Sequence, residues 1–122
     1  MNIPSQYLPI MPYLILKDAK EFAGFMKTVF NASEQLLIPE GEKVRHGQLR
    51  IGDAVIMFAD ANDTWNKMSA GMFIYVRDVN EVYNSALISG AKSLMPPEKK
   101  EYGFTAGFED PFGNHFWIVQ GE

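Results

Sequence analysis

The side chains best suited to acid–base or metal chemistry are scarce in this sequence. His46 and His115 are its two histidines, and it has no cysteine, so thiol catalysis, disulfides and cysteine-ligated zinc are excluded. A histidine beside an acid can move protons in a reaction, and Glu109 is the acid we consider as a partner. In a metal site built on both histidines, the two rings would have to meet together with at least one acid. Nothing in their spacing along the sequence brings these side chains together. We interpret both as hydrogen-bonded structural or pocket-wall residues, and keep them as candidate general acids or bases of a metal-free reaction.

Aromatic side chains offer a second kind of chemistry, the stacking of flat ligands. Any one of these rings could equally belong to the core, but a groove lined by several would hold a planar, largely apolar molecule. Arg45, Arg50 or a tyrosine hydroxyl could then orient it. The candidates in strand-like runs are Tyr13, Phe58, Phe73, Tyr75 and Trp117, and those in loops are Trp65, Tyr102 and Phe104.

A repeat with a spacing of sixty residues predicts the elements that position these side chains. The run Tyr13–Asp18 matches Phe73–Asp78: each is an apolar stretch that ends in a basic residue and an aspartate. A glutamate follows three residues later, as Glu21 or Glu81, so both copies carry an Asp-x-x-Glu signal for the start of a helix. We therefore predict a duplicated unit with Asp18 and Asp78 as helix caps. The spacing becomes 61 residues at the final strands.

The periodicity predicts the order β-α-β-β-β in each half. Polar residues 60–69 form the predicted linker, and Gly90 is the predicted C-terminal cap of the second helix. Pro96-Pro97 is read as a strand breaker, and Glu98–Glu101 as a solvated hairpin tip. The expected strands are 11–16, 33–38, 45–51, 54–59, 72–76 and 92–95, with two more on either side of the turn 110–114; the expected helices are 19–30 and 79–89.

Several predicted strands are apolar on both faces, which bears on function. Tyr13 and Ile15 alternate with Leu14 and Leu16, although a face exposed to water should be polar. We assign Ile56 and Phe58, with the other strand aromatics, to the face opposite the helix. That face must be covered by the other half of the chain, by a second subunit or by a small molecule.

The composition of the chain indicates which kinds of partner and which cellular location to expect. With 15 acidic and 11 basic residues the net charge is −4, which argues against nucleic acid and anionic membranes. The early apolar run is interrupted by Pro9 and Pro12 and lacks a basic leader, so we predict neither a signal peptide nor a membrane span. A chain of 122 residues fits one domain. The sequence predicts a cytoplasmic protein.

The order of these motifs resembles the vicinal oxygen chelate superfamily, in its glyoxalase and bleomycin-resistance branch and especially its PhnB-like members. The resemblance rests on the tandem units, on the motif His46–Asp53 and on Asp110–Trp117. It implies an α+β fold in which two βαβββ modules, about residues 8–60 and 70–120, form a single domain with a mixed sheet. That sheet would be an incomplete barrel around a cleft, and a homodimer would be usual.

The resemblance also implies four positions at which relatives hold a divalent metal. In this sequence they are occupied by Met11, Ile56, Gly71 and Trp117, none of which offers a hard or borderline donor. We therefore expect no metal and no other cofactor. Gly71 would leave room in the cleft where relatives place a ligand side chain.

Three functions remain open. The first is a metal-free protein that binds a small, planar, largely apolar molecule, and we favour it over an enzyme. The second is a lyase, isomerase or dioxygenase, metal-dependent or metal-free; the third is a dimeric structural module without a ligand. For the first, the predicted ligand-binding residues are Met11, Tyr13, Arg50, Ile56, Phe58, Trp65, Gly71, Phe73, Tyr75, His115 and Trp117.

Overall fold

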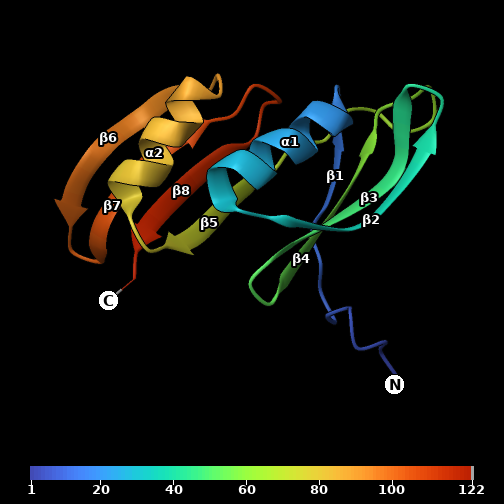
Figure 1. Ribbon diagram of the computed structural model, residues 1–122, viewed down its shortest axis with the longest axis horizontal. Helices are drawn as coiled ribbons and strands as arrows, with labels where there is room; N and C mark the ends of the chain where they lie inside the picture. The colour runs from blue at the N-terminus through green and yellow to red at the C-terminus, as the bar shows by residue number, and fades with distance from the viewer. Residues whose placement is uncertain (122) are drawn as a thin grey trace. The chain divides into compact units, whose positions relative to one another are not determined.

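The computed structural model describes residues 1–121, which contain two successive β-α-β-β-β units (Figure 1). The chain divides into two compact units, the first spanning Met1–Met68 and the second beginning at Ser69. The elements of the first unit are β1 (Tyr13–Leu16), α1 (Ala19–Phe30), β2 (Ser33–Glu40), β3 (Lys43–Ile51) and β4 (Ala54–Asp60). Those of the second are β5 (Gly71–Val76), α2 (Val79–Ile88), β6 (Lys92–Lys100), β7 (Gly103–Glu109) and β8 (His115–Gln120).

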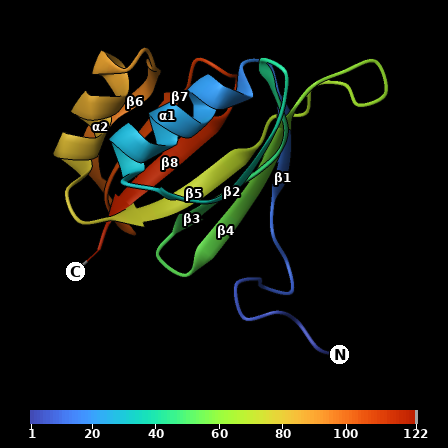
Figure 2. The ribbon, with the colours of Figure 1, turned by 45° about the vertical axis from the view of Figure 1, so that its right-hand side comes forward.

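Each unit is a four-stranded mixed sheet with one helix on one face. The strand order is β1-β4-β3-β2 in the first unit and β5-β8-β7-β6 in the second. The pairs β1–β4 and β5–β8 are parallel, and the other neighbours are antiparallel. In the second unit α2 packs on β6, β7 and β8, as Figure 2 shows for β6 and β7. The predicted α+β class with tandem βαβββ modules and mixed sheets is confirmed, whereas the barrel and the cleft stay predictions.

The core of the first unit lies between α1 and its sheet. The apolar stripe of α1 places Phe22 and Met26 against the sheet, where both are fully buried. Phe58 of β4 is fully buried too, and its ring meets that of Phe22 edge-on at a centroid distance of 5.4 Å. Gly47 of β3 leaves room for this ring, because a Cβ there would collide with Phe58.

The strand register corrects the predicted face of two residues. Tyr13 pairs with Met57 in the first unit, as Phe73 pairs with Trp117 in the second, so the sixty-residue spacing continues into the last strands. The predicted shift to 61 was wrong because it was measured from glycines in turns of different length. Met57, not Ile56, therefore corresponds to Trp117. Ile56 and Phe58 are buried on the helix side, and their assignment to the opposite face is wrong.

The two helices begin differently, although their sequence signals match. Asp78 accepts a hydrogen bond from the Glu81 amide at 3.1 Å, as predicted for a cap. Asp18 makes no side-chain cap and lies in the left-handed region with a φ of 58°, so its predicted capping role is wrong. Instead, Asp60 at the end of β4 accepts from the Ala19 amide at 3.1 Å.

In the second unit, β6 runs farther than its prolines suggested. It continues through Pro96 and Pro97 to Lys100, with irregular pairing to β7 between Ser93 and Glu98. Since β6 is an edge strand, a residue without an N–H can be accommodated at its unpaired side or at an irregularity. The predicted break at Pro96-Pro97 is therefore wrong. The predicted hairpin tip at Glu98–Glu101 is confirmed only at Glu101, because residues 98–100 belong to β6 and the turn consists of Glu101 and Tyr102.

The turn between β7 and β8 is held by its own side chains. Asp110 Oδ1 accepts from the amides of Phe112 and Asn114 at 2.9 and 2.8 Å, and its Oδ2 accepts from Asn114 Nδ2 at 2.7 Å. Asn114 Oδ1 accepts from the Ala70 amide at 3.0 Å, which ties the turn to the start of β5. Burial raises the pKa of Asp110, while these hydrogen bonds act to lower it.

Neither helix in residues 1–121 has the length and apolar character needed to cross a membrane.

Candidate ligand-binding site

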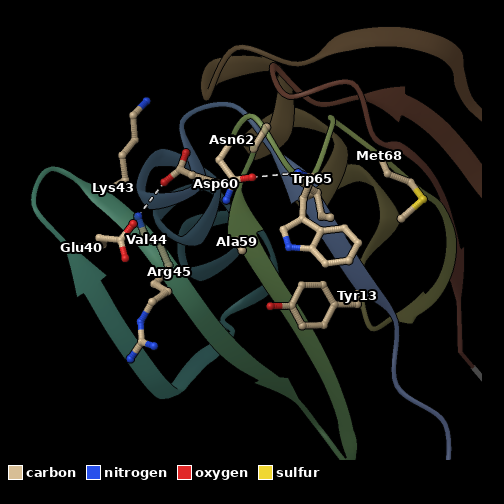
Figure 3. A pocket seen from close by; sticks show the side chains of 12 residues that line it. Tyr13, Glu40, Lys43, Val44, Arg45, Ala59, Asp60, Asn62, Trp65 and Met68 are labelled. Atoms are coloured by element: carbon tan, nitrogen blue, oxygen red, sulfur yellow. Dashed lines mark hydrogen bonds between the residues drawn. The ribbon is translucent and has the colours of Figure 1, made fainter.

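The first unit contains a pocket of about 540 Å³, within the usual range for small-molecule sites (Figure 3). Its apolar wall comes from Tyr13 and Ile15 of β1, Ala59 of β4, and Trp65 and Met68 from the segment that follows β4. The other lining residues are Glu40, Lys43, Val44, Arg45, Asp60, Ala61 and Asn62. The pocket therefore has an apolar and aromatic side and a polar side.

The segment 61–68 folds onto the first unit, although its polar sequence predicted a plain linker. Met68 and Ile15 exchange two backbone hydrogen bonds, of 2.7 and 3.0 Å. Asn62 Oδ1 accepts from the amides of Thr64 and Trp65, both at 2.8 Å, and forms a compact turn. This turn holds the Trp65 backbone so that its indole lies beside Tyr13 at the pocket (Figure 3).

A row of hydrogen-bonded polar side chains extends from Tyr13, which lines the pocket, to His46 and Gln48 of β3. The Tyr13 hydroxyl lies 2.9 Å from His46 Nδ1. His46 Nε2 lies 2.9 Å from Gln48 Nε2, and Gln48 also donates to the Tyr7 hydroxyl at 3.1 Å. Gln48 is nearly fully buried, so these contacts satisfy a polar group that burial would otherwise destabilise.

The row continues to β2 and to the segment before β1. Gln35 Nε2 donates to Gln48 Oε1 at 2.9 Å, and Gln35 Oε1 accepts from Arg50 Nε and Nη2 at 3.2 and 3.0 Å. Arg50 Nη2 also donates to the Gln6 carbonyl at 2.8 Å. The predicted ligand-binding residue Arg50 is thus held by Gln35 and Gln6, and it is not among the residues that line this pocket.

His46 is disposed to remain neutral. Partial burial, followed by the positive charge of Arg45, lowers its pKa. A neutral imidazole can accept a hydrogen bond at one nitrogen and donate at the other, which matches one contact with Gln48 and one with Tyr13.

The charged residues at the pocket include both signs. Lys43 and Arg45 are exposed, and Glu40 lies with them at the same end. Asp60 is engaged in the structure, because its oxygens accept from the amides of Ala19 and Val44 at 3.1 and 2.6 Å. The pocket therefore carries both positively and negatively charged side chains, and its charges do not select a ligand of one sign.

The second unit gathers other predicted residues on the helix-free face of its sheet. Phe73 is 54% exposed and Tyr75 is 70% exposed, with their ring centroids 5.7 Å apart. Tyr102, which the sequence placed in a loop, lies 6.3 Å from Phe73 by ring centroids. The Trp117 ring lies over Gly71, where an added Cβ would be 3.1 Å from it. Trp117 therefore occupies the room that Gly71 was expected to leave.

His115 lies beside the acid that we considered for it. Its Nε2 is 3.5 Å from Glu109 Oε1, because the two residues are paired across β7 and β8. The His115 ring also meets Trp117 at a centroid distance of 6.1 Å. This pair belongs to the second unit, whereas His46 lies in the first.

The structure thus unites only part of the predicted site. Tyr13 and Trp65 share the pocket, Met11 is half-buried just before β1, and Ile56 and Phe58 are buried in the core. The residues that the sequence reading missed are Tyr7, Ile15, Gln35, Gln48, Ala59, Asn62 and Met68. One signal was available for Gln48, because the polar residues at 46, 48 and 50 alternate with Gly47, Leu49 and Ile51.

The positions at which the resemblance implied a metal do not fit one. They are occupied by Met11, Gly71 and Trp117, and the register replaces Ile56 by Met57. Thioether, hydrogen and indole are poor ligands for the divalent metals that oxygen and imidazole bind. In residues 1–121, moreover, no three His, Asp or Glu side chains are grouped so that they could hold a metal ion.

Comparison with solved structures shows the same fold in proteins of low sequence identity. PA1353 from Pseudomonas aeruginosa matches with a TM-score of 0.80 at 19% identity, over 94% of this chain and all of the other. A PhnB protein from Bacillus cereus, described as a putative 3-demethylubiquinone-9 3-methyltransferase, matches with a TM-score of 0.75 at 15% identity, over 93% and 100% of the chains. The fosfomycin resistance protein FosX from Mesorhizobium loti matches with a TM-score of 0.67 at 18% identity, over 95% and 92%.

Sequence comparison shows the family of the chain. An uncharacterized protein of Shewanella frigidimarina is 32% identical over 69 residues, which are 57% of this chain and 40% of that protein's length. The family model described as the Glyoxalase/Bleomycin resistance protein/Dioxygenase superfamily matches residues 8–118. Since that match extends over both βαβββ units, the chain belongs to this superfamily.

Proposed function

We propose that the protein binds a small, planar, largely apolar molecule in the pocket of its first unit and does so without a metal. The observation that carries this proposal is the pocket itself, of about 540 Å³, with Tyr13 and Trp65 on its apolar side. An aromatic ring in the pocket would stack on these side chains, and ring pairs of this kind are worth about 0.5–1.5 kcal/mol beyond their buried area.

A thermal-shift screen with planar aromatic compounds tests the proposal. Compounds that bind the native state raise the midpoint of unfolding in a concentration-dependent way. We expect hits whose effect is weakened in Trp65→Ala. The matched control is Trp117→Ala, which removes an indole from the second unit and should preserve the hits. A screen without hits, or hits unaffected by Trp65→Ala, would contradict the proposal.

An enzymatic function is the alternative, because the description of the matching superfamily includes glyoxalases and dioxygenases. The His115–Glu109 pair is the one histidine–carboxylate contact among residues 1–121 that favours it. Elemental analysis of protein purified without chelators separates the metal-dependent form of this alternative from our proposal. One equivalent of zinc, nickel, manganese or iron per chain would contradict metal-free binding.

We also propose that the protein is a homodimer and that a second copy covers the exposed apolar face of the second unit. This face carries Phe73, Tyr75, Leu94, Tyr102 and Trp117, each at least 40% exposed. Contiguous apolar surface of this kind usually marks an interface. The remaining predictions, a cytoplasmic location and no nucleic-acid or membrane partner, rest on the sequence.

Analytical ultracentrifugation tests the homodimer. Phe73→Glu should shift the wild-type dimer to monomer, because it buries a charge in the interface. Ile88→Glu is the matched control, since Ile88 is 87% exposed at the end of α2, away from the aromatic face. A monomeric wild type, or an equal effect of both variants, would contradict the dimer.

A further inference from the structure

The row of polar side chains that ends at Tyr13 in the pocket has one consistent direction of hydrogen bonding. It begins at Arg50, whose guanidinium can only donate. The atom of Gln35 that receives Arg50 Nε and Nη2 must therefore be its amide oxygen. The Gln35 amide nitrogen then donates to Gln48 Oε1, and it also lies 3.3 Å from the Gln6 carbonyl, which can only accept. The orientation of both glutamine amides is thereby determined.

This direction determines the protonation of His46. With its oxygen occupied by Gln35, Gln48 presents its amide hydrogens to the Tyr7 hydroxyl and to His46 Nε2. A nitrogen that faces a donor must carry a lone pair, so His46 is neutral and holds its proton on Nδ1. Nδ1 in turn donates to the Tyr13 oxygen at 2.9 Å.

The Tyr13 hydroxyl then keeps its own hydrogen for another acceptor. Tyr13 makes no other hydrogen bond within residues 1–121, it is 44% exposed, and it lines the pocket. Figure 3 shows its hydroxyl directed across the pocket, toward the side that carries Arg45. A ligand in the pocket would meet this hydroxyl as a donor.

We infer that the row from Arg50 to His46 makes Tyr13 a hydrogen-bond donor, so that the pocket selects planar aromatic molecules carrying a carbonyl-type oxygen over equally shaped molecules without one. In this arrangement Tyr13 contacts the ligand, and His46, Gln48, Gln35 and Arg50 are positioning residues. The inference rests on the proposed function, because it takes the pocket as the ligand site.

The tautomer of His46 can be measured without any ligand. In a His115→Gln background His46 is the single histidine, and long-range ¹H–¹⁵N correlations at pH 7.5 show which ring nitrogen carries the proton. We expect a neutral ring protonated at Nδ1, and a loss of that exclusive tautomer in Gln48→Met, which removes the amide donor at similar volume. A proton on Nε2, or on both nitrogens, would overturn the inference.

A matched pair of compounds tests the ligand preference. 2-Acetylnaphthalene carries a carbonyl oxygen, and 2-isopropenylnaphthalene has nearly the same shape with a methylene group in its place. Calorimetric titration of the wild type should favour the ketone by about five-fold, the usual worth of one hydrogen bond. In Tyr13→Phe the preference should vanish, while the affinity for 2-isopropenylnaphthalene stays within about two-fold of wild type.

The two experiments distinguish failure of the inference from failure of the proposed function. If the wild type bound both compounds equally, the donor role of Tyr13 would be refuted while ligand binding stood. If it bound neither, the proposed function would be contradicted for this class of ligand. In that case the ligand preference would be contradicted as well. The His46 measurement would then test only the direction of the hydrogen bonds from Arg50 to Tyr13.

Discussion

At the scale of single residues, the protonation state of His46 is determined by the side chains around its ring. Its ring lies between the Tyr13 hydroxyl and the Gln48 amide, and partial burial with Arg45 nearby lowers its pKa. Protonation would place a new N–H against the amide hydrogens of Gln48. The folded protein therefore favours the neutral ring, and the stability of the fold is linked to pH.

The sign of this linkage gives a prediction for stability. Between the lowered folded pKa and the unfolded value of about 6.5, the unfolded chain binds the proton and the folded one does not. The contribution of neutral His46 should therefore be complete above pH 6.5 and should decrease as the pH falls through that value. Urea unfolding at pH 7.5 and at pH 5.5 measures this contribution, as the difference in the free energy of unfolding between wild type and His46→Gln. We expect that difference to be smaller at pH 5.5.

His115→Gln is the control for that measurement, because it leaves His46 and its neighbours unchanged. It should retain the loss that His46 contributes between the two pH values. If the difference between wild type and His46→Gln were independent of pH, or grew on acidification, the inferred environment of His46 would be wrong.

Single-residue roles were predictable only where the residue type limits the options. Trp65, an indole in a polar segment, was singled out from sequence and lines the pocket. Phe58 was placed on the wrong face because both faces of its strand are apolar, so periodicity could not distinguish them. Of the two partners of His46, Gln48 lies two residues along the same strand β3, whereas Tyr13 lies on β1, and no local pattern specifies that second contact.

At the scale of elements, the two helix starts show that one motif can have two outcomes. The first amide of each helix donates to the last residue of a strand: the Ala19 amide donates to Asp60 of β4 at 3.1 Å, and the Val79 amide donates to Gln120 of β8 at 2.9 Å. Asp78 adds its own cap, whereas Asp18 has left-handed backbone angles. The sequence showed the shared motif, but the long-range caps depend on strand pairing that only the folded chain defines.

The same substitution should therefore have opposite effects at the two aspartates. Asp18→Gly should raise the free energy of unfolding by about 0.5 kcal/mol, because glycine adopts a φ of 58° without steric cost. Asp78→Gly should lower it by a few tenths to about 1 kcal/mol, through the lost cap and the added flexibility of an extended residue. Urea unfolding at pH 7.5 measures both.

Asp60→Ala provides the scale for these effects. It removes the acceptor of two amides, so it should cost about 2 kcal/mol or more. If Asp18→Gly destabilised the protein as much as Asp78→Gly, the two helix starts would be equivalent after all.

The strand–helix order was predictable because each element carries its own periodicity, and the turn at Asp110 and Asn114 was the most specific motif. The structure gives its physical basis, since these two side chains satisfy three backbone amides and each other. Strand β6 was mispredicted because whether a proline breaks a strand depends on the strand's place in the sheet.

At the scale of the whole molecule, the two units share one topology and have different surfaces. The first has a pocket lined in part by Trp65 and Met68, and the second exposes Phe73 and Tyr75. The sequence predicted the repeated order of elements and the fold, because both follow from order and spacing. It did not predict the pocket of the first unit, which depends on how the segment 61–68 folds onto β1.

The most direct test of the account is the fluorescence of Trp65 in a Trp117→Phe protein, where it is the single tryptophan. We predict a saturable change in its emission on titration with 2-acetylnaphthalene, and no such change in free tryptophan at the same concentrations. An emission that stays unchanged, or that changes linearly without saturation, would contradict ligand binding in the pocket of the first unit.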